Sequence, residues 1–207
     1  DYKNTSINKK ILADSKRQRR RLTEIGAIDF KMLSSEEEIK EITNKMFEFK
    51  QQRYKEMNVL NVLKNEEHKN FYKKMPTAIG SIGKIHCSAL YLDDEIIALH
   101  WGVETQKVFY YLMPAHSGDT WSKFSPGKLL LEELMKVCAN KNIMCFDFTA
   151  GDEPYKRIWT NSNFVLGESL KAFSVKGKLY IFLISIKEIF NKYPLLKKLY
   201  NKIKYRN

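Results

Sequence analysis

The stretch SKFSPGKLLLEEL, residues 122–134, decides the fold because it begins a helix that lies between two strands. Its leucines and glutamates favour a helix, which we expect to cover residues 125–140. The segment KVFYYLM (107–113) before it and the apolar segment IMCFDF (143–148) after it have the composition of strands. A helical crossover of this length normally joins parallel strands. The three segments therefore predict a βαβ unit within one sheet.

The first turn of this helix has the sequence Ser125-Pro126-Gly127-Lys128. A serine at the N-cap accepts a hydrogen bond from a first-turn amide, and a proline suits the first helical position because its missing N–H needs no partner. Gly127 leaves the turn without a bulky side chain, and Lys128 adds a positive charge. Free amides and a cation at a helix start suit a phosphate group. The turn is therefore either an ordinary helix start or a phosphate-binding site.

The other segments predict an α+β chain with one mixed, mostly antiparallel sheet flanked by helices. The expected order is a strand at 27–33, helices at 34–57 and 65–75, antiparallel strands at 84–92 and 95–105, the βαβ unit, and a short helix within 149–159. A closing hairpin is expected from segments 164–175 and 178–185, around a turn at Lys176-Gly177.

The positive charge of the chain is concentrated at its two ends. The net charge is +12 at pH 7, and residues 1–21 and 187–207 each carry +6, so residues 22–186 sum to zero. We therefore divide the chain into a basic lead-in (1–21), a central domain (22–186) and a basic amphipathic helix (187–207). Basic ends suit nucleic acid, acidic lipid headgroups or another protein, or they are simply solvated faces.

Composition excludes several classes of protein. With 43% hydrophobic and 13% aromatic residues, the chain has the material for one folded domain. No apolar run approaches the roughly 20 residues that span a bilayer, and the first residues lack the apolar core of a signal peptide. Cys87, Cys138 and Cys145 have no metal-ligand spacing, so we expect reduced thiols and no metal site in a cytoplasmic protein. One catalytic cysteine is the alternative use of these residues.

The order of elements, with a phosphate-ready turn after the fourth strand, resembles that of the GNAT acyltransferases. Ser125-Pro126-Gly127 before a leucine-rich helix, and the segment DFTAGDEPYKRIWT (147–160), more closely resemble the CelD-like branch, which is linked to cellulose and exopolysaccharide synthesis. The resemblance covers roughly residues 15–185 and includes the basic segment SKRQRRRLTEIGAIDF (15–30). Of the general GNAT glycine motif, only Gly127 is present.

The resemblance implies a GNAT-like fold and an acyltransferase that uses acyl-coenzyme A, in particular acetyl-coenzyme A. The implied acceptor is an amine or hydroxyl of a sugar or cell-envelope molecule, and an additional N-terminal domain would precede this chain in a longer protein. Two alternatives stay open: a Fem-like aminoacyl transferase that uses aminoacyl-tRNA, and a non-catalytic module with the GNAT fold. The basic C-terminal helix would either dock on an anionic surface at the inner face of a membrane or pack on the sheet.

The resemblance also implies where the donor binds. In GNAT folds the pyrophosphate lies against the turn before the central helix, which here implies Ser125, Pro126, Gly127, Lys128 and Leu129 as donor-binding residues. The pantetheine arm runs along the preceding strand in such folds. An amide at Leu112 or Met113 would then polarise the thioester carbonyl.

Acyl transfer also needs groups that move protons. Tyr155 is the candidate acid, because GNAT enzymes often place a tyrosine beside the coenzyme sulfur, although it equally suits a packing role. His100 and Glu104 lie four residues apart on one expected strand and are the candidate bases. A lone strand histidine, however, is more often a packing residue.

Asp147 competes with His100 and Glu104 for the role of base. Its position at the end of a buried strand favours a structural anchor paired with Lys156 or Arg157. The remaining histidines of this region, at 86 and 116, have no recognisable partners in the sequence.

Overall fold

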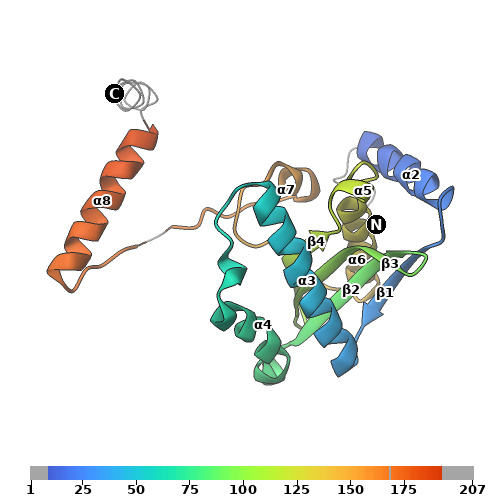
Figure 1. Ribbon diagram of the computed structural model, residues 1–207, viewed down its shortest axis with the longest axis horizontal. Helices are drawn as coiled ribbons and strands as arrows, with labels where there is room; N and C mark the ends of the chain where they lie inside the picture. Colours follow the sequence, from blue (N-terminus) through green and yellow to red (C-terminus); the bar gives the residue numbers. More distant parts are fainter. Residues whose placement is uncertain (1–8, 168, 193–207) are drawn as a thin grey trace. The chain divides into compact units, whose positions relative to one another are not determined.

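The computed structural model describes residues 9–167 and 169–192, which fall into one unit up to Asn163 and another from Phe164 (Figure 1). The elements of the first unit are α2 (Lys9–Thr23), β1 (Ile28–Leu33), α3 (Glu36–Glu56), the 3-10 turn η1 (Val62–Lys64), α4 (Glu66–Ala78), the 3-10 turn η2 (Gly80–Ile82), β2 (Lys84–Leu92), β3 (Glu95–Glu104), β4 (Val108–His116), α5 (Asp119–Ser122), α6 (Pro126–Asn140), β5 (Cys145–Asp147) and α7 (Pro154–Trp159). The second unit contains α8 (Val175–Lys192).

One five-stranded sheet organises the first unit. Its strand order is β1-β2-β3-β4-β5, and the first three pairings are antiparallel. β5 runs parallel to β4, because α6 carries the chain back across the sheet between them. The predicted α+β fold, with its mixed, mostly antiparallel sheet and its βαβ crossover, is confirmed.

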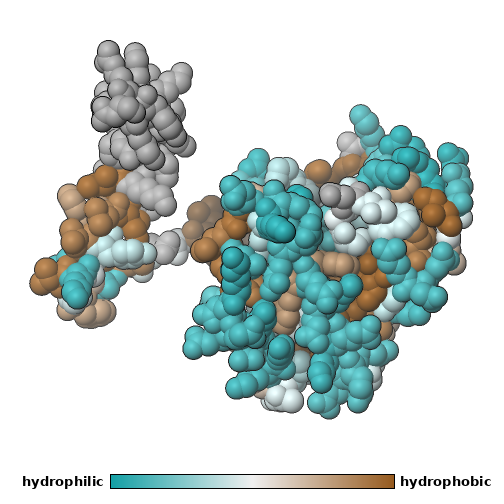
Figure 2. Space-filling model, in the orientation of Figure 1, coloured by the Kyte–Doolittle hydropathy of each residue, from teal (hydrophilic) through white to brown (hydrophobic). Residues whose placement is uncertain are grey.

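Helices cover both faces of the sheet (Figure 1). On one face α6 buries Leu129, Leu130, Leu131 and Leu134 against the sheet, together with Leu22 of α2. On the other face α3 buries Ile42, Met46 and Phe47. Each fully buried side chain of this size stabilises the fold by roughly 2 kcal/mol relative to leaving it exposed. The outer surface of α3 is hydrophilic (Figure 2), as expected for a helix with one buried face.

Local sequence signals explain most element boundaries. The Ser35 hydroxyl accepts from the Glu38 amide at 3.2 Å, and the Glu38 carboxylate accepts from the Ser35 amide at 2.9 Å, so a capping box begins α3. Asn65 caps α4 as its position suggested, but Pro76 lies inside that helix and does not end it. β4 also ends three residues later than expected, because it continues through Pro114 to His116.

The expectation of a closing hairpin is wrong, because its second segment is helical. The Gly177 amide donates to the Ser174 hydroxyl at 3.1 Å, and the Lys178 amide donates to the Ser174 carbonyl at 2.9 Å. The Lys176-Gly177 pair therefore lies in the first turn of α8, after a serine cap.

α8 also covers the beginning of the basic helix expected at 187–207, and residues 193–207 lie outside the described part of the chain. Its surface is largely hydrophobic in Figure 2 and includes the exposed side chains Leu179, Phe182 and Leu183. None of the helices within residues 9–192 that the structure describes is long and apolar enough to cross a membrane.

A β-bulge in the β3–β4 pair brings Gly102 opposite two residues of β4, Tyr111 and Leu112. A Cβ atom at residue 102 would collide with the Tyr110 carbonyl oxygen and come within 2.5 Å of His100 Cε1. A carbonyl held in a strand cannot move aside easily, so the bulge requires glycine at this position.

Gly102→Ala is therefore expected to lower the free energy of unfolding by about 1–3 kcal/mol, as overpacking does elsewhere. Urea denaturation followed by circular dichroism measures this change. Gly167→Ala is the matched control, because a Cβ atom there meets no atom within 4 Å. Equal effects of the two substitutions would contradict the steric account.

Candidate functional site

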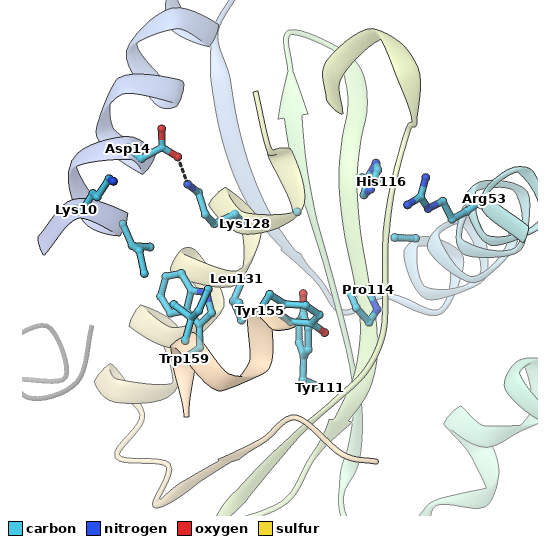
Figure 3. Close-up of a pocket in the computed structure, with 14 residues that line it drawn as sticks. Lys10, Asp14, Arg53, Tyr111, Pro114, His116, Lys128, Leu131, Tyr155 and Trp159 are labelled. Atoms are coloured by element: carbon cyan, nitrogen blue, oxygen red, sulfur yellow. Dashed lines mark hydrogen bonds and ion pairs between the residues drawn. The ribbon is translucent and has the colours of Figure 1, made fainter. Parts of the chain in front are cut away.

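A cavity of about 660 Å³ lies beside the first turn of α6 (Figure 3). Five elements supply its walls: α2, α3, β4, α6 and α7. The lining residues are Lys10, Ile11, Asp14, Arg53, Tyr111, Pro114, Ala115, His116, Gly127, Lys128, Leu131, Tyr155, Ile158 and Trp159. An apolar middle with charged groups at its ends suits a long ligand that is itself anionic at one end.

The cavity exists because β4 and β5 separate early. They pair only over three residues each, up to Tyr110 and Asp147. The Asp147 carboxylate then accepts from the Thr149 amide at 2.6 Å, and positive φ angles of 59° at Thr149 and 117° at Gly151 turn the chain away. β4 continues to His116, and within the described residues no strand pairs with this part of its edge beyond Tyr110. The edge therefore becomes a wall of the cavity.

The hydrogen bond from the Thr149 amide makes Asp147 an anchor of the turn. The expected pairing of Asp147 with Lys156 or Arg157 is wrong, because both cations pair with other carboxylates. Lys156 pairs with Glu153 at 2.8 Å, and Arg157 donates to Asp152 at 2.9 Å. These pairs lie within the turn and first part of α7 and help to hold this helix over the cavity.

The first turn of α6 exposes one amide. Ser125 has left-handed backbone angles (φ 53°, ψ 51°) and its side chain makes no capping bond, so the predicted hydroxyl cap is wrong. Its carbonyl instead accepts from the Lys128 and Leu129 amides at 3.0 and 3.2 Å. Pro126 has no N–H, which leaves Gly127 as the first-turn residue whose amide has no recorded acceptor among the described residues. A strained non-glycine residue at such a turn is common at ligand sites.

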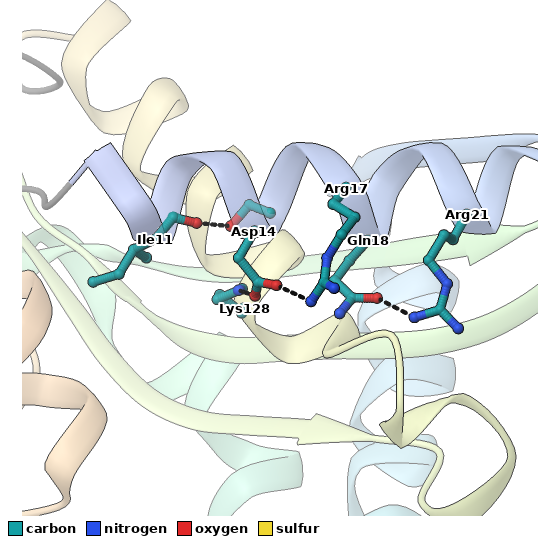
Figure 4. Close-up of polar contacts among 7 residues, drawn as sticks. Ile11, Asp14, Arg17, Gln18, Arg21 and Lys128 are labelled. Atoms are coloured by element: carbon teal, nitrogen blue, oxygen red, sulfur yellow. Dashed lines mark hydrogen bonds and ion pairs between the residues drawn. The ribbon is translucent and has the colours of Figure 1, made fainter.

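Charge at this end of the cavity is shared between α2 and α6 (Figure 4). The Lys128 ammonium forms an ion pair with Asp14, which also accepts from Arg17 at 2.6 Å. The hydrogen bond from Lys128, followed by that from Arg17, lowers the pKa of Asp14. Asp14 is therefore ionised at neutral pH and offsets the charge of Lys128, while Lys10 adds a further cation to the cavity wall.

Two tyrosines, Tyr155 and Tyr111, line the cavity (Figure 3). Tyr155 belongs to α7 and Tyr111 to β4. Burial, followed by the charge of Glu153, raises the pKa of Tyr155 to about 12. Burial also raises the pKa of Tyr111. Both phenols therefore keep their protons at neutral pH and can donate hydrogen bonds.

Leu112 and Met113, which were expected to present an amide to the donor, differ in their surroundings. Neither side chain lines the cavity. The Tyr72 hydroxyl donates to Met113 Sδ at 3.6 Å on the α3 face of the sheet. The Ser117 amide donates to the Ile97 carbonyl of β3 at 3.1 Å. In an antiparallel pair every second residue of a strand directs its amide to the neighbouring strand, and Met113 lies four residues before Ser117. The Met113 amide therefore also points toward β3. Leu112 lies in the bulge, where this alternation is interrupted.

The structure places His100 in the core between the sheet and α6. Its side chain has no exposed surface and stacks on Tyr111 (4.8 Å between centroids, 3° between planes) and Phe109 (5.2 Å, 27°). Neither ring nitrogen has a hydrogen-bond partner among the described residues. Burial, followed by the charges of His86 and Lys50, lowers the pKa of His100 well below its usual value. His100 is thus a neutral ring outside the cavity wall.

Glu104 lies near the other end of β3, also outside the cavity wall. It pairs with Lys141 at 2.7 Å, with Lys84 at 3.1 Å and with His86 at 3.4 Å. Burial raises the pKa of Glu104, but the hydrogen bonds from the two lysines outweigh it and the pKa is lowered. A carboxylate held in this way has little tendency to take up a proton.

His116 lines the cavity together with Arg53 of α3, a pairing that sequence reasoning missed (Figure 3). About sixty residues separate the two in sequence, so no local spacing connects them. One signal was available: if β4 is extended through Pro114, His116 falls at the carboxyl end of the strand, where ligands of such sheets bind.

Within the described part of the chain, no cysteine lines the cavity and no metal site is found. Burial raises the pKa values of Cys87 and Cys138 to about 12, and neither these two nor the exposed Cys145 lines the cavity. Within residues 9–167 and 169–192, no group of three or more His, Cys, Asp or Glu could hold a metal ion.

The surroundings of His100 generate a prediction for acid stability. Below pH 6.5 the unfolded chain protonates this histidine while the folded protein keeps it neutral, so folding loses up to about 1.4 kcal/mol per pH unit from this group. Phenylalanine would stack on Tyr111 and Phe109 without taking up a proton. His100→Phe should therefore retain stability at pH 7.5 and reduce the loss of stability between pH 6.5 and 5.

Urea denaturation at several pH values measures this slope. His86, whose pKa burial lowers to about 4, adds its own acid dependence to wild type and variant alike. His68→Gln, at an exposed position on α4, is the control for the removal of a histidine outside the core. A slope in His100→Phe as steep as that of wild type would show that His100 does not titrate as described.

Comparison with known proteins adds a family match. Residues 9–157 match the family model described as an acetyltransferase (GNAT) domain. The matched segment includes α2, α3, the whole sheet, α6 and the first part of α7. It therefore contains the residues that line the cavity except Ile158 and Trp159. Among curated proteins, no match to the chain is found.

Proposed function

Because the chain belongs to the GNAT acetyltransferase family, we propose that its cavity binds acyl-coenzyme A and that the acyl group, most simply acetyl, is transferred to an acceptor. The observation that carries this proposal is the amide of Gly127, a residue that lines the cavity in the first turn of a 15-residue helix. This amide has no recorded acceptor among the described residues. The partial positive charge of such a helix start stabilises a bound phosphate.

The charged end of the cavity suits the donor's diphosphate. Gly127 has no side chain that would keep phosphate oxygens away from the backbone. Packing does not require glycine here, because a Cβ atom would have only ordinary contact with His116 Cδ2 at 3.8 Å. Lys128 and Lys10 supply positive charge from α6 and α2. Asp14 would share Lys128 with the diphosphate, so we expect its ion pair to loosen when the donor binds. In this proposal Ser125 and Pro126 shape the turn and do not donate.

The apolar middle of the cavity suits the pantetheine arm. Leu131, Ile158 and Trp159 supply apolar surface there. The unpaired edge of β4 lies alongside and can offer backbone groups, except at Pro114, which has no N–H. Because the Met113 amide points toward β3, we assign the polarising amide to the bulge at Leu112.

We assign the acid role to Tyr155. A phenol is a weaker acid than a thiol, so it can protonate a departing thiolate only through a direct hydrogen bond. Tyr155 lines the cavity with 36% of its surface exposed, retains its proton and can donate a hydrogen bond there. We assign the base role to neither His100 nor Glu104, because the first has no exposed surface and the second is held by two lysines.

For the acceptor we propose an amine or hydroxyl of a sugar or cell-envelope molecule. This rests on the resemblance of Ser125-Pro126-Gly127 and of segment 147–160 to the CelD-like branch, and on no contact in the cavity. Use of aminoacyl-tRNA and a non-catalytic role stay as alternatives. Docking of the C-terminal region on an anionic membrane stays a prediction.

Calorimetric titration with acetyl-coenzyme A tests the proposed donor. We expect micromolar binding to wild type and a loss of more than about 100-fold in Gly127→Glu, because a carboxylate beside the diphosphate costs several kcal/mol. Gly127→Ala is the matched control: the methyl group has room, so affinity should fall much less. Absence of binding by folded wild type would refute the proposal and favour the tRNA or non-catalytic alternatives.

Tyr155→Phe tests the proposed acid. Removal of a general acid should lower kcat about 100-fold or more and leave the KM for acetyl-coenzyme A nearly unchanged. Release of free coenzyme A, followed with a thiol reagent and an acceptor identified by screening, measures both constants. Tyr110→Phe is the control, since Tyr110 does not line the cavity. A variant with wild-type kcat would limit Tyr155 to packing.

A further inference from the structure

His116 ends β4 at the point where the strand meets the first turn of α6. Its side chain is partly buried and lines the cavity. The Gly118 amide lies 3.3 Å from His116 Nδ1. A backbone amide can only donate, so Nδ1 must be the acceptor and cannot carry a proton in this arrangement. A neutral imidazole at this position therefore carries its proton on Nε2.

The Cδ2 atom of this ring lies near Gly127. His116 Cδ2 is 3.8 Å from the position that a Cβ atom on Gly127 would occupy, and Nε2 is bonded to Cδ2. Among the described residues, Nε2 has no recorded hydrogen-bond partner. The Gly127 amide, which likewise has no recorded acceptor there, belongs to the same cavity wall. Two residues that carry a donor without a recorded acceptor among the described residues thus line the cavity near the start of α6.

The charged groups around His116 keep its ring neutral at pH 7. Burial, followed by the charge of Arg53, lowers the pKa of His116; Glu56 raises it and Lys50 lowers it further. These three side chains come from α3, where Arg53 pairs with Glu56 at 3.4 Å. From α6 and α2 the cavity wall adds the Lys128–Asp14 ion pair and Lys10, and their opposite charges partly cancel.

We propose that the His116 Nε2–H donates a hydrogen bond to a phosphate oxygen of the donor's diphosphate, next to the Gly127 amide. This inference rests on the proposed use of acyl-coenzyme A. It makes His116 a donor-binding residue and excludes it as the base that activates the acceptor, because Nε2 holds a proton and the Nδ1 lone pair is taken by Gly118. The cavity then holds the diphosphate from a side chain at the end of β4 as well as from the backbone of α6.

Two substitutions of His116 test the roles of its two ring nitrogens separately. Asparagine can accept from the Gly118 amide as Nδ1 does, but it is too short to replace Nε2. Glutamine carries its amide nitrogen near the position of Nε2 and can still donate there. His116→Asn should therefore keep the local fold and lose the contact to the phosphate, and His116→Gln should keep the contact.

Calorimetric titration with coenzyme A tests the inference, with thermal unfolding as the check on folding. We expect Kd to rise about 10- to 100-fold in His116→Asn, as for loss of a hydrogen bond to a charged group, and about threefold or less in His116→Gln. If wild type binds coenzyme A and His116→Asn binds equally well, or if His116→Gln is as weak as His116→Asn, the inference is wrong while the proposed function stands. If folded wild type does not bind coenzyme A, the proposed function itself fails.

Discussion

The early separation of β4 and β5 is the constraint on which the rest of the site depends. Three residues of parallel pairing hold the two strands together, and the turn anchored by Asp147 then directs the chain away. A longer pairing would cover the edge of β4 with another strand and fill the space that the cavity occupies. The same turn leads into α7, which places Tyr155 over the open edge. One short strand thus creates both the cavity and one of its walls.

The start of the crossover helix α6 is the second feature on which the site depends. The left-handed conformation of Ser125 directs its carbonyl to the Lys128 and Leu129 amides, which satisfies both of them internally. Among the described residues this leaves the Gly127 amide as the first-turn donor without a recorded acceptor, so the turn has fewer free donors than a helix start with several unpaired amides. In the proposed binding mode, a neighbouring donor such as His116 would therefore contribute more than it would at a fully open turn.

Position on the sheet, rather than residue type, decides what the histidines can do. His100 lies in the middle of β3 under α6, where stacking on two aromatic rings replaces hydrogen bonding and its charged form is excluded. His116 lies at the carboxyl end of β4, where one nitrogen is held by the backbone and the other borders the cavity. The first acts as an aromatic packing residue, and the second has the geometry of a hydrogen-bond donor.

Sequence alone predicted the parts of the fold that depend on local signals. The antiparallel strands expected at 84–92 and 95–105 and the crossover around α6 involve residues close in sequence, and each is confirmed. The closing hairpin was wrong because a Lys-Gly pair suits a helix first turn after Ser174 as well as a hairpin turn. Both are local arrangements, and the choice between them depends on contacts that a pattern does not contain.

The candidate site was predictable only in part, since a cavity joins residues that are far apart in sequence. Gly127, Lys128 and Tyr155 line it as their motifs suggested they should. His100 was proposed from its spacing with Glu104, but the pattern could not show that the ring would be fully buried. Arg53 and Asp14 carried no signal at all, because their positions follow from how α3 and α2 pack beside the sheet.

An NMR titration of the isotopically labelled chain with coenzyme A tests the central claim most directly, since it reports each amide separately. If the diphosphate binds at the start of α6, the largest amide shifts should occur at Gly127 and its neighbours Lys128 and Leu129, with smaller shifts along the open edge of β4. Shifts confined to other elements, such as α4 or α8, or no shift at all in the first turn of α6 at saturating coenzyme A, would contradict the account.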